Sequence, residues 1–539
     1  MATTDPHQTQ QAKDEADLAK FGYKQELHRS LGVFSSFAVA FSYISPSTGI
    51  FTLFYLALTI GGIMFWTWPV VALGQLMIAL NFAELSSHYP VAGSVYQWTK
   101  YLSSRGYAWF TGWVYMFAGI ITVSAVCATL PIALIPALNS MFGTNFNNTL
   151  GSHSQLVIAI ITLVVITVLN IFGVRLVAIV NNTGVIFEIL GMVVFAFVMA
   201  LFHNHQGVGV IFHSQGLSVT ASTFLTAMFM SLFVIYGFDT AGTLAEETKN
   251  PKRESPRAII GAIIGALIIG GIFLWATLMA VPGGAPGMKK AGESLAVGAQ
   301  TVIEANFSAA LATVYLLVVS AAIFVCCMSI MTSTVRLCFG MARDDQLPAS
   351  KGLSRVHHSL HTPVWSCIAV AVLAAIPFLQ FAGATVVAVA ATAMIYLSYF
   401  LGNVVFMRAR MRGWPRTEAP FKLGVWGPIV TGLGLLWGAA MLVNFLWFSN
   451  SSQFDLRWLT NPKATQTDYF GTGPLVNFHI AFLNKIPVIE LIMCTIALIG
   501  AIYFFAVQRN KPYTPVIIPE GEEGVPGAAP APGTASAQA

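Results

Sequence analysis

Two clusters of small and polar residues interrupt long apolar runs, and they carry groups that could bind a small charged molecule. The first cluster is residues 45–49 (SPSTG), and the second is residues 235–242 (IYGFDTAG). Proline removes a backbone donor and clashes with the preceding helical turn, and glycine tolerates irregular dihedral angles. We therefore expect each cluster to break a helix within an apolar layer.

A broken helix exposes two kinds of unpaired backbone group. The N-terminal end of its second half presents amides and partial positive charge, and the C-terminal end of its first half presents carbonyls. In the first cluster, the amides of Thr48, Gly49 and Ile50 are expected to receive a carboxylate. The hydroxyls of Ser47 and Thr48 add two further donors.

The second cluster offers the complementary group. The carbonyls of Ile235, Tyr236 and Gly237 are expected to receive an ammonium, helped by the carboxylate of Asp239. A zwitterion fits the two breaks together. The alternative is a simple proline kink in each helix, which membrane helices tolerate. Two interruptions at equivalent places in two halves of a chain favour a transporter binding site over two kinks.

Glu188 is an acidic residue inside an otherwise apolar run. An intramembrane carboxylate is costly unless it is neutral or paired, which makes it a functional candidate. We expect Glu188 to couple proton movement to transport; a packing role and a counter-charge for a cationic substrate are the alternatives. Sodium would instead use hydroxyls such as those of Ser320 and Ser329, but serine commonly serves packing in membrane helices. Proton coupling is therefore favoured over sodium.

Five charged residues are expected near the inner mouth of the pathway. Opposite charges there can form pairs that close a gate and separate when it opens. The alternative is solvated interfacial charge, for which exposed pairs contribute only ~0–1 kcal/mol. The five candidate gate residues are Glu84, Glu246, Glu247, Arg336 and Arg343.

No metal or other cofactor is expected, because the six cysteines lack metal-ligand spacing.

Membrane helices must position all of these residues. Only 9% of the 539 residues are charged and the mean hydropathy is +0.71, whereas soluble domains carry about a quarter charged residues. Apolar stretches of about 20 residues, enough to cross a bilayer, recur along the chain. We predict twelve spans, at 31–60, 62–87, 107–136, 154–173, 176–202, 222–247, 257–281, 307–334, 363–381, 384–407, 426–448 and 486–508.

The positive charges predict the orientation. Twelve spans place both termini on one side, and cytoplasmic loops carry the excess of Lys and Arg. With the N-terminus inside, all but five of the 27 Lys and Arg residues lie on the inner side. We therefore predict a cytoplasmic tail at 1–30, a transmembrane domain at 31–508 and a disordered cytoplasmic tail at 509–539. The five outer residues are Lys289, Lys290, Arg457, Lys463 and Lys485.

Four segments resemble the amino acid–polyamine–organocation (APC) transporter family, especially its amino acid/choline and GABA permease branch. They are FGYKQELHRSLGVFSSFAVAFSYISPSTGIF (21–51), NFAELSSHYPVAGSVYQWTKYL (81–102), YGFDTAGTLAEETKNPKRESPRAI (236–259) and RLCFGMARDDQLP (336–348). The resemblance implies the leucine-transporter fold, an all-α polytopic membrane architecture. Its two inverted five-helix repeats would be 31–202 and 222–407, followed by two extra helices in 426–508.

The resemblance also implies roles for particular residues. Ser47, Thr48 and Gly49 correspond to the loop that cradles the substrate carboxylate, although 45–49 departs from the glycine-serine-glycine type of many relatives. Phe238 matches the aromatic residue that caps the substrate from outside, with Tyr236, Gly237 and Asp239 beside it.

The expected function is secondary active transport by alternating access of a small amino acid, GABA or a related amine. We expect proton coupling or exchange, in the cell inner (plasma) membrane, with the lipid bilayer and the substrate as partners. The alternatives are a nutrient sensor without net transport, or a choline or polyamine transporter of the same fold. A membrane enzyme would need a catalytic constellation, and an ATP-driven pump a P-loop; the sequence has neither pattern. The net charge of +5 reflects where the Lys and Arg residues lie relative to the lipid, and it indicates no nucleic-acid partner.

Overall fold

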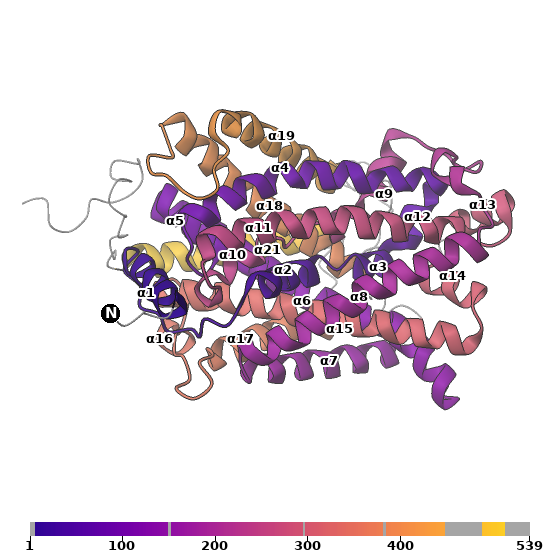
Figure 1. Cartoon of the computed structure of the whole chain (residues 1–539), viewed down its shortest axis with the longest axis horizontal. Coiled ribbons are helices and arrows are strands. Elements are labelled where there is room, and N and C mark those ends of the chain that lie inside the picture. Colours follow the sequence, from indigo (N-terminus) through magenta and orange to yellow (C-terminus); the bar gives the residue numbers. More distant parts are fainter. Residues whose placement is uncertain (1–5, 149–151, 295–296, 381–383, 448–487, 512–539) are drawn as a thin grey trace, which may run out of the picture.

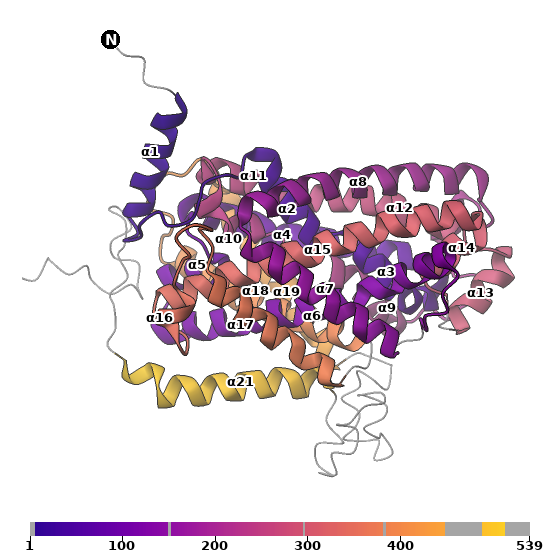
Figure 2. The ribbon, with the colours of Figure 1, turned by 90° about the horizontal axis from the view of Figure 1, so that it is seen from below.

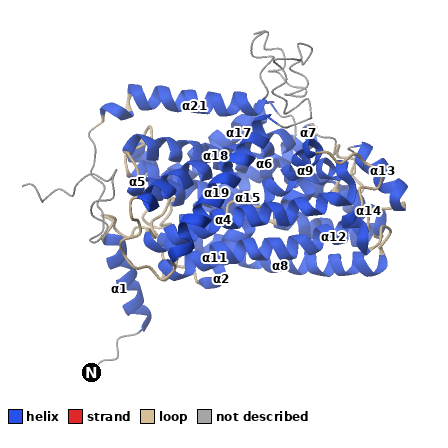
Figure 3. Ribbon diagram, turned by 90° about the horizontal axis from the view of Figure 1, so that it is seen from above, coloured by secondary structure: helices blue, strands red, loops and turns tan. Residues whose placement is uncertain are grey.

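The computed structural model describes residues 6–148, 152–294, 297–380, 384–447 and 488–511. The described chain is helical throughout, with no β-strand (Figure 3). The predicted tail beyond Lys511 and the connection at 448–487 lie outside the described residues. The first elements in chain order are α1 (Pro6–Ala19), α2 (Val33–Ile44), α3 (Pro46–Ala57), the 3-10 segment η1 (Leu58–Trp66) and α4 (Thr67–His88).

The remaining elements follow in chain order. After α4, the chain continues with α5 (Ser94–Leu102), α6 (Arg105–Phe142), α7 (His153–Ile171) and α8 (Val174–Phe202), and η2 (Val208–Phe212) follows. The next elements are α9 (Ala221–Val234), α10 (Thr240–Thr243), η3 (Ala245–Glu247), α11 (Pro251–Gly265), η4 (Ala266–Gly270) and α12 (Gly271–Met279). They are followed by α13 (Gly284–Ser294), α14 (Ala299–Asn306), α15 (Ala309–Arg343), α16 (Ser350–Leu353), α17 (Val364–Ala375), η5 (Ile376–Gln380) and α18 (Ala384–Met411). The last are η6 (Gly424–Trp426), α19 (Gly427–Trp447), α21 (Val488–Ala506) and η10 (Gln508–Asn510).

The predicted number of spans agrees with the helices. Within the described residues, 9 helical stretches are long and apolar enough to cross a membrane. The first stretch, Val33–His88, covers two predicted spans, and the shorter apolar helices Ala221–Val234 and Val364–Leu379 fall on two more. Each of the twelve predicted ranges therefore contains a helix, and the all-helical membrane fold is confirmed.

The helices run roughly along one axis, so the bundle has two ends (Figure 1). We call the end with α1, α5, α10 and α16 the N-terminal end, and the end with α13 and α14 the far end. Asp344 Oδ1 accepts a hydrogen bond from Tyr23 (2.7 Å), and Lys511 pairs with the adjacent Asp345 (3.0 Å). Both described ends of the chain therefore meet at the N-terminal end.

The interior of the bundle is formed chiefly by α6 and α15, which pack against each other more extensively than any other pair of helices. Most of the residues on α6 are buried, from Ala108 to Ala137. By contrast, α21 lies along the outside of the bundle (Figure 2) and is largely exposed. Its exposed face is apolar, as expected for a helix that faces lipid.

Candidate functional site

The first predicted break is confirmed at Ser45. The helix α2 ends at Ile44, Ser45 adopts a left-handed conformation with φ of 37°, and α3 begins at Pro46. Proline at the first helical position is favourable, since its fixed φ suits the helix and its missing N–H would be unpaired there. The backbone therefore changes direction at one residue, and the first turn of α3 faces the interior.

The break leaves fewer free amides than expected. The N–H of Gly49 donates to the carbonyl of Ser45 (3.5 Å), and Ile50 continues the helical ladder behind it. The expectation that both amides are free is therefore wrong, because α3 starts earlier than the sequence suggested. The N–H of Thr48 donates no hydrogen bond among the described residues. Thr48 is thus the residue that combines a free amide with a hydroxyl.

Glu188 lies at the N-terminal end of α3. Its Oε1 accepts hydrogen bonds from the hydroxyls of Ser45 (2.7 Å) and Ser47 (2.6 Å). The main-chain N–H of Ser47 also bonds this carboxyl group. Glu188 is buried and forms no ion pair within the described part of the chain. A carboxylate from α8 therefore already occupies donors of a helix N-terminus, the kind of place that suits an anion.

The second predicted break is confirmed between α9 and α10. The helix α9 ends at Val234, and Gly237 has a φ of 83°, which favours glycine. A Cβ at Gly237 would lie 1.9 Å from Tyr43 Cδ1, so a side chain has no room there. The carbonyl of Gly237 accepts from the N–H of Thr240 (3.0 Å). The carbonyls of Ile235 and Tyr236 accept no hydrogen bond among the described residues and remain available for an ammonium.

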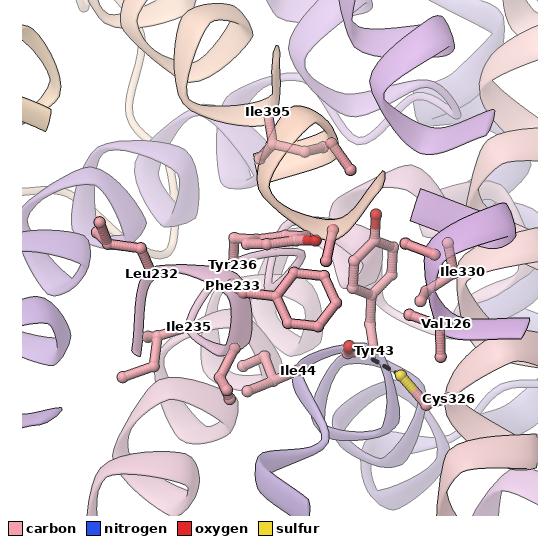
Figure 4. Packing of buried hydrophobic residues seen from close by; sticks show 14 of the residues in the cluster. Tyr43, Ile44, Val126, Leu232, Phe233, Ile235, Tyr236, Cys326, Ile330 and Ile395 are labelled. Carbon is pink, nitrogen blue, oxygen red and sulfur yellow. Dashed lines mark hydrogen bonds between the residues drawn. The ribbon is translucent and has the colours of Figure 1, made fainter. Parts of the chain in front are cut away.

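A small cavity lies between the two breaks. Its volume is ≈ 10 Å³, about one water molecule, so an amino acid enters only when the surrounding helices separate. Figure 4 shows the rings of Tyr43, Phe233 and Tyr236 turned toward one another, near Cys326. The cavity is lined by Tyr43, Ile44, Thr48, Gly49, Thr122, Val126, Phe233, Tyr236, Cys326 and Ile330.

The predicted binding residues divide into two groups. Thr48, Gly49 and Tyr236 line the cavity, whereas Ser47, Ile50, Gly237, Phe238 and Asp239 are not part of its lining. Phe238 packs against the rings of Phe82 and Tyr399. The phenylalanine that lines the cavity is Phe233, one residue before the end of α9. Sequence reasoning missed Phe233, because an apolar residue in an apolar helix gives no local signal.

Asp239 lies in a separate hydrogen-bonded cluster. Ser94 donates to its Oδ2 (2.7 Å), and the hydroxyls of Tyr115 and Tyr399 also donate to the carboxylate. The N–H of Gly237 donates to the Tyr399 hydroxyl (2.9 Å). The carboxylate therefore fixes the backbone of the second break through Tyr399, and it already accepts hydrogen bonds from three helices, α5, α6 and α18.

The comparison with known proteins decides the family. Residues 31–462 match the family model described as "Amino acid permease". This chain belongs to the amino acid permease family. The permease is therefore a multi-pass membrane transporter, and the resemblance to APC transporters is confirmed.

Curated relatives cover most of the permease. It is 29% identical over 461 residues to "Amino-acid permease BAT1 homolog" of Oryza sativa subsp. japonica, which covers 80% of this chain and 87% of the rice protein. It is 28% identical over 463 residues to "Amino-acid permease BAT1" of Arabidopsis thaliana (79% and 87%). It is also 28% identical over 474 residues to "Branched-chain amino acid permease BcaP" of Bacillus subtilis (80% and 91%).

Four of the five expected gate residues of the permease pair with one another. Arg343 donates two hydrogen bonds to Glu246 (2.7 and 3.0 Å), and Arg336 donates to Glu247 (2.7 Å). Both glutamates and Arg336 are buried. The alternative of solvated interfacial charge therefore does not describe these four residues. They join η3, just after the second break, to the last turns of α15.

Glu84 has different partners. It pairs with Arg410 of α18 and accepts the N–H of Leu423 (3.0 Å). Glu84 therefore ties α4 to α18 and to the chain before α19, away from the other four. Arg410 was missed because the sequence places it in a basic inner loop segment, where solvent exposure is the usual expectation.

A second group of residues missed by sequence reasoning joins the N-terminal segment (residues 20–32) to the bundle. The Tyr23 hydroxyl and Lys100 Nζ each donate to Asp344 (2.7 Å). The Tyr23 ring lies 3.8 Å below the guanidinium of Arg343, a cation–π contact. Arg29 donates to the carbonyl of Thr248 (2.7 Å). The N-terminal segment therefore covers the Arg343–Glu246 and Arg336–Glu247 pairs at the N-terminal end of the bundle.

Proposed function

We propose that the permease carries a small zwitterionic amino acid across the membrane by alternating access. The observation that carries this proposal is the meeting of two broken helices around one cavity. Thr48 and Tyr236 line this cavity. The free amide and hydroxyl of Thr48 can bind a carboxylate, and the free carbonyls of Tyr236 and of its neighbour Ile235 can bind an ammonium. Broken-helix ends at the centre of a membrane serve this purpose in transporters of this architecture.

The side-chain part of the cavity favours an aliphatic substrate. Ile44, Val126, Phe233 and Ile330 form apolar walls, and none of the lining residues is charged. Apolar walls stabilise an apolar side chain by removing it from water. The name of the Bacillus subtilis relative, a branched-chain amino acid permease, agrees with this preference. GABA and related amines are the next candidates.

Proton coupling through Glu188 and gating by the Arg343–Glu246 and Arg336–Glu247 pairs complete the proposal. The pairs lie at the predicted cytoplasmic end, where their separation would open a path to the cavity. Glu188 is buried beside the first break without a cation. The proposed location is the plasma membrane, with both termini in the cytoplasm.

The test is uptake of labelled L-leucine, L-alanine, GABA, choline and putrescine into proteoliposomes, with and without a pH or sodium gradient. We expect L-leucine uptake that an inward proton gradient increases and a sodium gradient leaves unchanged. Uptake of choline or putrescine instead of the amino acids would contradict the zwitterion site. Binding of L-leucine without any flux would indicate a nutrient sensor.

A matched pair of variants distinguishes a change in the cavity from a general loss of stability. Phe233→Ala enlarges the cavity and should raise L-phenylalanine uptake relative to L-leucine. Phe229→Ala removes the same side chain from the same helix, but Phe229 packs against Phe445 and is not part of the cavity lining. Each truncation costs about 3–5 kcal/mol of stability, so only a change of preference confined to Phe233→Ala supports the site.

A further inference from the structure

A chain of hydroxyls connects the cavity wall to Glu188. Thr48 lines the cavity, and its Oγ1 lies 2.7 Å from Ser45 Oγ. Ser45 Oγ in turn donates to Glu188 Oε1 at 2.7 Å. Ser47 donates to the same carboxylate oxygen (2.6 Å) but forms no side-chain hydrogen bond with Thr48. Ser45 is therefore the hydroxyl that joins the cavity to the acidic group.

The direction of these hydrogen bonds depends on whether Glu188 is protonated. A hydroxyl has one proton to donate, and an ionised carboxylate only accepts. When Glu188 is ionised, the proton of Ser45 is used on Glu188, so Thr48 must donate to Ser45. The Thr48 hydroxyl then faces the cavity with lone pairs, which repel a carboxylate.

Protonation of Glu188 reverses the direction of the hydrogen bonds between Glu188, Ser45 and Thr48. A protonated Glu188 donates to Ser45 while still accepting from Ser47. Ser45 then donates to Thr48, and the proton of Thr48 turns toward the cavity, where it can bind a carboxylate oxygen beside the free amide of Thr48.

We propose that Ser45 and Thr48 form a relay that makes binding of the substrate carboxylate conditional on a proton at Glu188. This inference rests on the proposed function and specifies its coupling step. A proton from water on the side to which the site is open forms an O–H bond with Glu188, and the same proton returns to water after the substrate leaves. Ser45 acts as a positioning residue, and carboxylate-bearing amino acids are the coupled substrates.

Among the residues that the structure describes, the surroundings of Glu188 contain no other group to take this role. Of the elements around α8, α2, α3, η4 and α12 contain no Asp, Glu, Lys, Arg or His, and α7 contains only His153, at its start. On α15, Tyr315 and Cys326 face Glu188, and both residue types are ordinarily neutral near pH 7. Arg336 on α15 is paired with Glu247 and lies ten residues beyond Cys326, about 15 Å along the helix.

A purely structural role for Ser45 is the competing explanation. Ser45 and Ser47 would then only hold Glu188 in place, and both hydroxyls would be equivalent. The two explanations differ in one respect: only Ser45 also contacts Thr48 at a short distance. Ser45→Gly and Ser47→Ala each remove one bond to Glu188, but only the former breaks the relay. Glycine suits the left-handed backbone at Ser45, so Ser45→Gly removes the hydroxyl without backbone strain.

The experiment measures equilibrium binding of L-leucine and GABA to the purified full chain at about pH 5.5 and about pH 8. Their decarboxylated analogues, 3-methylbutylamine and propylamine, are the controls without a carboxylate. For the wild type we expect the Kd of both amino acids to rise about tenfold at the higher pH, the loss of one hydrogen bond. The Kd of the amines should not rise.

The variants decide between the explanations. In Ser45→Gly, Thr48 is free to donate at either pH, so the L-leucine Kd should be tight and independent of pH. Glu188→Gln, whose amide donates permanently, should behave in the same way. Ser47→Ala should keep the wild-type pH dependence. Amine binding by each variant confirms that its site is folded.

Three results would overturn the relay alone: a wild-type L-leucine Kd that does not change with pH, wild-type pH dependence in Ser45→Gly, or equal effects of Ser45→Gly and Ser47→Ala. Absence of amino acid binding and uptake at both pH values would instead overturn the proposed function, and the relay with it.

Discussion

The buried pair of Arg336 and Glu247 shows how much a single residue contributes to this permease. Both side chains are 1% exposed. Removing two charges from water is costly, and their attraction compensates only while both are present. A buried pair is therefore a weak source of net stability but a strong constraint, because either partner alone is an uncompensated charge.

Replacing Arg336 tests this constraint. Arg336→Met should destabilise the permease by about 3–5 kcal/mol, since Glu247 is left buried without its partner. The double variant Arg336→Met/Glu247→Leu should recover much of that loss. Thermal or denaturant unfolding in detergent measures the effect. The control is Lys422→Met, which removes an exposed pair with Glu418 and should cost less than about 1 kcal/mol; equal losses for both single variants would contradict the argument.

At the scale of elements, the N-terminal segment closes the N-terminal end of the bundle by its contacts with α5, the end of α15 and η3. Asp344, just after α15, connects Tyr23 and Lys100. Burial opposes the charge of Asp344, but the neighbouring Lys100 and Arg343 outweigh this and hold the pKa of its carboxyl below the ordinary value. The ionised carboxylate should therefore hold both Lys100 and the Tyr23 hydroxyl of the segment at every physiological pH.

The sign of this pKa shift gives a prediction. A carboxyl group whose pKa is lower in the folded than in the unfolded protein stabilises the folded state at every pH above its unfolded-state pKa of about 3.9. That stabilisation is lost only as the pH falls through the lower, folded-state pKa. Asp344→Asn should therefore lower the melting temperature equally at about pH 5 and about pH 8. A loss that disappears at about pH 5 would contradict a lowered pKa. The pH dependence of transport in this range must then arise elsewhere, as in the Glu188 relay.

At the scale of the whole molecule, the two ends of the bundle differ in charge and should face different compartments. The described termini meet at one end, and Lys289 lies in α13 at the other. A membrane-impermeant maleimide should label Lys289→Cys in intact cells, whereas Arg257→Cys should react only after permeabilisation. Both parent side chains are at least half exposed, and the wild type is the control. The reverse pattern would contradict cytoplasmic termini.

Local features of the sequence were enough to predict the helices and both breaks. Pro46 and Gly237 act on the backbone within a few residues, because proline fixes φ and glycine permits positive φ. The length of each apolar run likewise follows from bilayer thickness, whatever the rest of the chain does. These constraints are local, and they determined the architecture and the region of the site.

Only the tertiary structure decided which groups meet. Ser47 and Glu188 are 141 residues apart in sequence, and the partner of Glu84 is 326 residues away. Likewise, the cavity is lined by Phe233 and not by Phe238, although both are phenylalanines at the same break. Side-chain partners depend on how distant helices pack, and no local propensity contains that information. The sequence thus determined where the helices open, and packing determined what each opening presents to the substrate.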